Sequence, residues 1–159
     1  MAFTIRTATL DDVEVLVRHR IQMFVDMGRV VDTGMLEREF SRWLHEHLPS
    51  GEYRAWLVEE GAAVAGGGGV TVIPWPPGPQ SPGDRLAFVY NVYTEKPYRR
   101  RGVARVVMAA IHRWCHASGV TSVALNASVD GLPLYESLGY ALMPNPMMFL
   151  SLSGYNPSA

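Results

Sequence analysis

A basic turn in the second half of the sequence has the residue types needed to bind phosphate oxygens. The apolar run at residues 86–94 is typical of a strand, three adjacent arginines occupy positions 99–101, and a helical pattern begins at Gly102. The first turn of a helix leaves backbone N–H groups unpaired at the positive end of the helix dipole. Gly102 and the small Ala104 let an anion approach that backbone closely. A solvated loop and a nucleic-acid contact are the alternatives for an arginine-rich turn.

The elements that must position this turn follow from the spacing of apolar residues. Helical spacing predicts helices over residues 12–28, 33–48, 102–118 and 132–138. Alternation and apolar runs predict strands over residues 3–7, 53–59, 70–73, 86–94, 120–126 and 140–152, the fifth of them buried on both sides. The order β-α-α-β-β-β-α-β-α-β predicts an α/β fold with a mixed, mostly antiparallel central sheet and helices on both faces. We expect a single domain over residues 3–152 and a C-terminal tail over 153–159.

Four consecutive glycines at positions 66–69 stand at the start of the third predicted strand. They fit either a flexible linker or a strand whose backbone makes close contacts. The dense apolar stretch that follows at once favours the strand. The proline-rich residues 74–83 are expected to form a stiff surface loop.

Composition excludes several classes of function. The formal net charge of the 159 residues is −1, which argues against a protein that grips nucleic acid along its whole surface. Cys115 is the only cysteine, so a disulfide within the chain and a cysteine-based zinc site are both excluded. Residues 1–7 lack the pattern of a signal peptide, and no run is apolar enough to span a bilayer. We therefore expect a cytoplasmic protein without a metal or a membrane partner.

Two motifs resemble those of the GNAT family of acetyl-CoA-dependent N-acetyltransferases. The first is Arg99-x-x-Gly102-x-Ala104 after a strand, which resembles the (Gln/Arg)-x-x-Gly-x-(Gly/Ala) signature of that family. The second is the segment at residues 125–140, in which a strand leads to a short helix containing Leu134-Tyr135-Glu136-Ser137-Leu138-Gly139-Tyr140. The order of elements along nearly the whole chain also fits. The turn lacks the P-loop pattern, which excludes that kind of nucleotide site.

The resemblance implies that the fourth and fifth strands, residues 86–94 and 120–126, splay apart and hold the pantetheine arm of acetyl-CoA. It implies that the backbone groups of Val92, Tyr93 and Thr94 contact the pantetheine and the acetyl carbonyl, with Asn126 near the pantetheine. It implies that the pyrophosphate is bound by the backbone N–H groups of Arg100, Arg101, Gly102, Val103 and Ala104. The side chains that would contact the phosphates are Arg99, Arg100 and Arg105.

The implied reaction is direct transfer of an acetyl group to an amine. Tyr135 matches the position at which the family often carries the acid that protonates the departing thiolate, although it could instead only pack or orient the sulfur. The general base stays open among Glu95, Asp84, Tyr90, His19 and Asp26. Cys115, in a helix beside Trp114, is expected to pack and not to act as a nucleophile.

Two departures from similar sequences bear on the site. Relatives often carry a histidine at the position of Asn126, and an Asn-Glu-Met ending where this chain has Asn145-Pro146-Met147. The apolar run that follows, up to Leu150, is expected to be core or interface, and a homodimer is one possibility.

The leading hypothesis is a small-molecule (or peptide) N-acetyltransferase with acetyl-CoA as co-substrate. A non-catalytic acetyl-CoA-binding regulatory module is the alternative. The amine acceptor stays open among polyamines, amino acids, antibiotics and protein N-termini.

Overall fold

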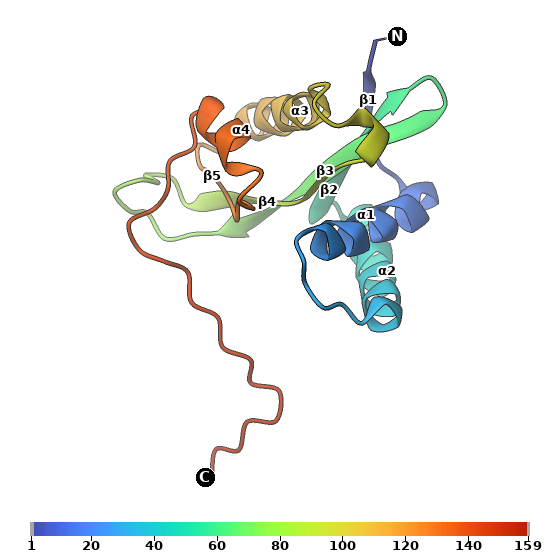
Figure 1. The fold of residues 1–159 in the computed structure, drawn as a ribbon. Helices are drawn as coiled ribbons and strands as arrows, with labels where there is room; N and C mark the ends of the chain where they lie inside the picture. The colour runs from blue at the N-terminus through green and yellow to red at the C-terminus, as the bar shows by residue number, and fades with distance from the viewer. Residues whose placement is uncertain (1, 159) are drawn as a thin grey trace.

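The computed structural model describes residues 2–158 and contains one five-stranded sheet with helices on both faces (Figure 1). The strands are β1 (Thr4–Thr7), β2 (Tyr53–Glu60), β3 (Ala63–Pro74), β4 (Arg85–Thr94) and β5 (Val123–Leu125). The helices are α1 (Val13–Asp26), α2 (Thr33–Ser50), α3 (Val103–Ala117) and α4 (Leu132–Ser137), with short 3-10 turns η1 (Leu10–Asp12) and η2 (Lys96–Tyr98). The predicted fold class is confirmed.

The strands lie in the sheet in the order in which they occur in the chain. β1 to β4 are antiparallel neighbours, and β5 alone runs parallel to the strand beside it, β4. A parallel pair needs a crossover connection, and α3 supplies it. The residues that carry the predicted basic turn therefore lie in the connection that leaves β4.

Each face of the sheet has its own hydrophobic core. The core under α1 and α2 contains Leu16, Phe40 and Leu44 packed on β2. The core under α3 contains Val107 and Ile111, packed on the opposite face. Figure 1 shows α1 and α2 on one side of the sheet and α3 with α4 on the other. Because both faces of the sheet are buried, the sequences of the central strands are almost continuously apolar.

The glycine run forms the middle of β3 and is packed too closely for side chains. A Cβ atom on Gly66 would lie 2.5 Å from the Tyr93 carbonyl oxygen, and one on Gly68 would lie 2.8 Å from a methyl group of Val107. At Gly69 the added atom would collide with the Tyr53 hydroxyl. The prediction of a strand with close backbone contacts is confirmed, and the linker alternative is wrong.

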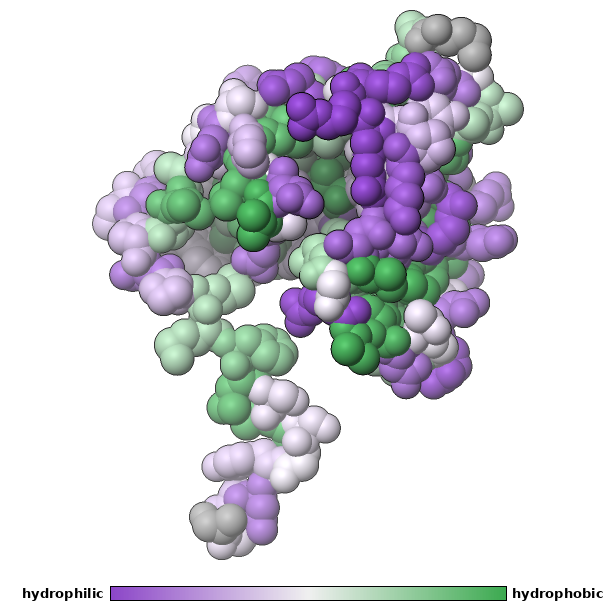
Figure 2. All heavy atoms as spheres, in the orientation of Figure 1, coloured by the Kyte–Doolittle hydropathy of each residue, from purple (hydrophilic) through white to green (hydrophobic). Residues whose placement is uncertain are grey.

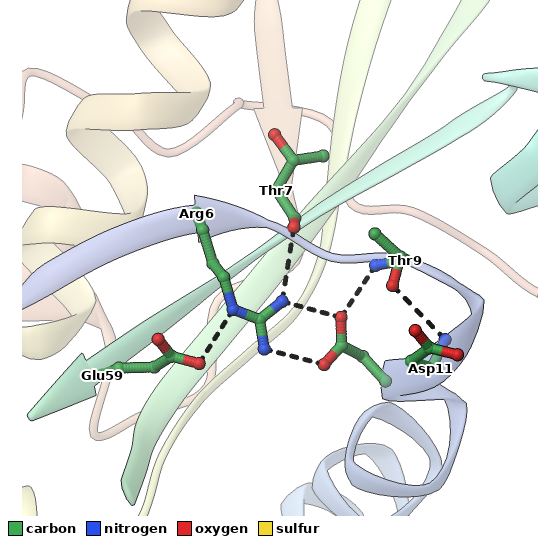
Figure 3. Close-up of polar contacts among 6 residues, drawn as sticks. Arg6, Thr7, Thr9, Asp11 and Glu59 are labelled. Carbon is green, nitrogen blue, oxygen red and sulfur yellow. Dashed lines mark hydrogen bonds and ion pairs between the residues drawn. The ribbon is translucent and has the colours of Figure 1, made fainter. Parts of the chain in front are cut away.

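A polar cluster fixes the turn between β1 and α1 (Figure 3). Thr9 accepts a hydrogen bond from the backbone of Asp11 and donates its own backbone N–H to the carboxylate of Asp12, 2.8 Å away. Arg6 donates both terminal nitrogens to the same carboxylate at 2.8 Å and its Nε to Glu59 at 2.8 Å. These bonds lower the pKa of Asp12, with the Arg6 hydrogen bonds as the main cause.

Two predictions about the end of the chain are wrong. β5 is only three residues long and half-buried, where residues 120–126 were expected to form a strand buried on both sides. No strand forms between residue 126 and residue 158, although one was expected over residues 140–152. Pro144 and Pro146 have no N–H to give to a ladder, and the chain leaves the sheet. Figure 2 shows the apolar residues of this segment standing away from the body of the molecule.

Candidate functional site

The gap between β4 and β5 is the first component of the site. The two strands pair only from Ala87 to Val89, opposite residues 123–125. β4 then continues to Thr94, and no strand within residues 2–158 pairs with that edge. The backbone of Val92, Tyr93 and Thr94 therefore lies along an open edge, and Asn126 follows the last paired residue of β5. Figure 2 shows a recess between the surface formed by α4 and that formed by α1 and α2. An extended ligand chain could take the place of the absent strand.

A bulge bends β4 at the start of this open edge. Tyr93 lies opposite Gly67 and Tyr90 lies opposite Gly69, so β4 contains one extra residue relative to β3 between these two pairs. Asn91, inside the bulge, adopts a left-handed backbone with φ of 59°. Asparagine is among the few non-glycine residues that tolerate this conformation. Bulges of this kind re-aim side chains and backbone groups, and they are common beside active sites.

The basic turn between η2 and α3 presents backbone N–H groups. Arg100 and Gly102 both have positive φ angles, 64° and 86°, and Gly102 caps α3 without a side-chain hydrogen bond. Successive N–H groups in such a turn form a concave anion-binding nest at the positive end of the helix dipole. A Cβ atom on Gly102 would meet nothing within 4 Å, so the space beside this backbone is open. The backbone predicted for the pyrophosphate, from Arg100 to Ala104, is thus arranged as an anion site requires.

The arginine side chains of the turn divide into two groups. Arg99 donates to Asp26 at 2.5 Å and to the Thr94 carbonyl at 3.2 Å, which ties the turn to α1. Arg101 donates to Glu60 at 2.5 Å and ties the turn to the β2–β3 hairpin. Arg105 donates to the Ser137 hydroxyl, and neither it nor the exposed Arg100 pairs with a carboxylate of residues 2–158. Arg100 and Arg105 therefore have no carboxylate partner in the described residues, and the phosphate roles of Arg99, Arg100 and Arg105 stay predictions.

Tyr135 lies on α4, half-buried at the margin of the core under α3. Its ring packs edge-on against Tyr140, with the centroids 5.8 Å apart. Burial raises the pKa of the Tyr135 phenol, which therefore keeps its proton at neutral pH. A general acid must carry a proton to give, so this chemistry suits the predicted role, which stays a prediction.

A buried histidine on α1 packs against the end of β4. The side chain of His19 on α1 is only 2% exposed, and its Nε2 lies 3.0 Å from Glu95, which also accepts from Arg18 at 2.6 Å. The His19 ring packs on Tyr93 with the centroids 5.0 Å apart. Burial lowers the pKa of His19 and outweighs the opposing effect of Glu95. A neutral imidazole therefore holds α1 against the open edge, a role that sequence alone did not indicate.

A separate cavity of about 650 Å³ lies between α1, α2 and the neighbouring strands. Its lining is largely apolar and aromatic, with Leu36, Phe40 and Trp43 from α2 and Val72 and Ile73 from β3. Tyr90 and Asn91 of β4 line it as well, so the cavity ends where the open edge of β4 begins. A ligand in the cavity would therefore meet a ligand lying along that edge.

The five candidates for the general base lie in different surroundings. Tyr90 is the only one of them that lines the cavity. Asp26 is paired with Arg99, and Glu95 with Arg18 and His19. The side chain of Asp84 is 90% exposed.

Cys115 is buried in the core, and burial raises the pKa of its thiol, which agrees with a packing role.

Within residues 2–158, no cluster of three or more histidine, cysteine or acidic side chains has the arrangement of a metal site. The same part of the chain contains no helix with the length and apolar character of a membrane span.

The comparisons with known proteins identify the class of protein that this fold and site define. The family model for the acetyltransferase (GNAT) family matches residues 22–140. The chain belongs to this family, and its class is that of an acyltransferase. The resemblance seen in the sequence motifs is thereby confirmed.

Solved structures show the same fold. A GCN5-related N-acetyltransferase from Ralstonia eutropha JMP134 is 30% identical with a TM-score of 0.87, over 94% of this chain and 99% of that one. A predicted acetyltransferase with acetyl-CoA from Clostridium acetobutylicum is 22% identical with a TM-score of 0.84, over 97% and 99%. An aminoglycoside N-acetyltransferase in complex with CoA is 16% identical with a TM-score of 0.75, over 94% and 95%. A search of curated proteins finds no match.

Proposed function

We propose that this protein is an N-acetyltransferase that moves the acetyl group of acetyl-CoA to a primary amine of a small molecule or peptide. The observation that carries the proposal is the continuity of three features along β4. The cavity reaches Tyr90 and Asn91, the open edge follows up to Thr94, and the anion nest begins at Arg100. An amine, a thioester and a pyrophosphate would meet these features in that order.

The residues present fit the cofactor. The open edge of β4 can pair with an amide-bearing arm, as Val92, Tyr93 and Thr94 are predicted to do. The nest at Arg100 and Gly102 suits phosphate oxygens. The acetyl-CoA and CoA named with two structures of this fold support the same choice. Acetyl-CoA, when bound, supplies a thioester that an amine can attack.

Three tasks then fall to residues of this chain. Backbone N–H groups at the open edge of β4 would stabilise negative charge on the carbonyl oxygen, because such donors are already fixed in place by the sheet. Tyr135 would give its proton to the departing thiolate. The acceptor must lose a proton as well, since an alkylammonium has a pKa of about 10. Tyr90 is the one candidate for the general base that lines the cavity, where it adjoins the open edge of β4.

The test is the balanced appearance of both products. The purified protein would be mixed with acetyl-CoA and a panel of amines, with released CoA thiol and acetylated amine measured in the same sample. We expect equal amounts of the two for at least one amine. Binding of acetyl-CoA without transfer to any amine would instead favour the regulatory module.

A further inference from the structure

Arg20 is a half-buried cation in the wall of the cavity between α1 and α2. Its guanidinium carbon lies 5.0 Å from the ring centroids of both Phe24 and Phe40. Burial lowers the pKa of the guanidinium, yet an arginine keeps its charge at neutral pH. No carboxylate within residues 2–158 forms an ion pair with it. A charge withdrawn from water is stabilised by a partner of opposite charge, and the described residues of this wall give Arg20 only the neutral Asn91 amide.

The direction of the hydrogen bonds around Arg20 is fixed by elementary chemistry. Arginine can only donate, so its bond of 2.6 Å to Asn91 requires the amide oxygen of Asn91 to face it. The amide nitrogen of Asn91 must then face Tyr53, to which it donates at 2.9 Å. The Tyr53 oxygen therefore acts as acceptor in this chain, and its own proton is left for another partner.

Tyr53 keeps that proton under ordinary conditions. Complete burial raises the pKa of its phenol to about 12. Tyr53 and Arg20 both line the cavity beside the bulge at Asn91. The wall thus combines a charged donor and a neutral O–H donor, which is a pair suited to the two oxygens of a carboxylate.

The acidic residues that line the cavity do not supply a counter-charge for Arg20. Glu39 is occupied by Arg42 on the same helix, and Glu52 lies 3.4 Å from His47. The other lining residues are mainly apolar or aromatic, with Trp43, Val72 and Ile73 among them. A ligand that fits would carry one anionic group and an apolar body.

We infer that the acceptor is an α-amino acid with an apolar or aromatic side chain, held by its carboxylate on Arg20 and Tyr53. The inference rests on the proposed function and names the substrate class of the same site. In an α-amino acid a single carbon separates the carboxylate from the amine. A carboxylate beside Asn91 therefore brings the amine to the start of the open edge of β4. Polyamines are disfavoured, because Arg20 would repel a second cation there.

The experiment compares acceptors that differ only in the carboxylate. We would measure kcat/KM for L-phenylalanine, L-phenylalaninamide and 2-phenylethylamine in the wild-type protein. Loss of hydrogen bonds to a charged group predicts a preference for L-phenylalanine of about 10- to 150-fold. Arg20→Gln should abolish the preference, and Tyr53→Phe should reduce it. Arg38→Gln, an exposed change on α2 with the same loss of charge, should keep it.

A binding arm makes the inference independent of turnover. Calorimetry would compare the product analogues N-acetyl-L-phenylalanine and N-(2-phenylethyl)acetamide on the wild type and on both cavity variants, with thermal melting as a check on folding. Tighter binding of the carboxylate in the wild type, lost in Arg20→Gln, is the expected result.

The inference is overturned if the neutral analogue binds equally well, or if 2-phenylethylamine is acetylated as fast as L-phenylalanine. A protein that acetylates 2-phenylethylamine efficiently would refute the amino acid alone and leave the acetyltransferase in place. Failure to bind acetyl-CoA would refute the proposed function. The calorimetric comparison of N-acetyl-L-phenylalanine with N-(2-phenylethyl)acetamide would still show whether Arg20 and Tyr53 bind a carboxylate.

Discussion

Replacement of Gly66 by alanine tests how the glycine run in β3 supports the cofactor site. The added Cβ would lie 2.5 Å from the Tyr93 carbonyl oxygen, 2.8 Å from a methyl group of Val103 and 3.2 Å from the Thr94 Cα. These atoms belong to the open edge of β4 and the first turn of α3. Because the nearest one is backbone, the cost should reach the upper end of the range for overpacking, about 3 kcal/mol.

A less flexible unfolded chain offsets up to about 1 kcal/mol of this cost. The net loss of about 2 kcal/mol corresponds to a fall in Tm of about 4–8 °C for a protein of this size. Calorimetry would give Tm, and titration with acetyl-CoA would give the change in affinity, which should weaken because β4 and α3 must both shift. Gly78→Ala, which meets nothing within 4 Å, is the control and should change neither. A Gly66→Ala protein as stable as the wild type, with unaltered acetyl-CoA affinity, would refute the reasoning.

Two further predictions concern single groups. Tyr135→Phe should lower turnover by about ten- to a thousandfold with little change in acetyl-CoA affinity, because only the proton is removed; unchanged turnover in steady-state assays would remove Tyr135 from the catalytic residues. The pKa of Asp12 is lowered in the folded protein, so its contribution to stability is present above its unfolded pKa of about 3.9 and is lost as the pH falls through the lower folded value. Denaturant unfolding between pH 2 and pH 7 should show this loss in the wild type, and Arg6→Gln should weaken it; equal pH profiles would contradict the assignment.

The glycine run shows what the sequence can predict about local structure. Four glycines before an apolar stretch favour a close-packed strand, and the contacts of Gly66 and Gly68 bear this out. The basic turn was predictable as well, since Gly102 caps α3 in a left-handed conformation that glycine adopts readily. The glycines indicate that something packs closely on them, but its identity in β4 and α3 comes only from the fold.

The last strand shows where the same reasoning fails. The run up to Leu150 has the composition of a strand, but a strand also needs a partner with free backbone groups. Pairing is a property of the sheet and not of the segment, and β5 pairs for only three residues. Pro144 and Pro146 indicated the weakness of this segment.

The joint position of Arg20 and Tyr53 in the cavity between α1 and α2 was not predicted, because the lining comes from two helices and three strands. Arg20 and Tyr53 are far apart in the sequence, and only packing places both beside Asn91. One signal was present, since Arg20 follows Val17 by three positions and precedes Phe24 by four. That spacing puts a charge on the apolar face of a helix, where a partner or a ligand is needed.

The central claim is that acetyl-CoA binds along the open edge of β4 and in the nest before α3. Hydrogen–deuterium exchange of the wild-type protein, with and without acetyl-CoA, tests it most directly, because amides that gain a hydrogen bond exchange more slowly. We predict slower exchange at residues 92–94 and 100–104. Exchange that is unaltered there, or slowed only in the cavity between α1 and α2, would contradict the account.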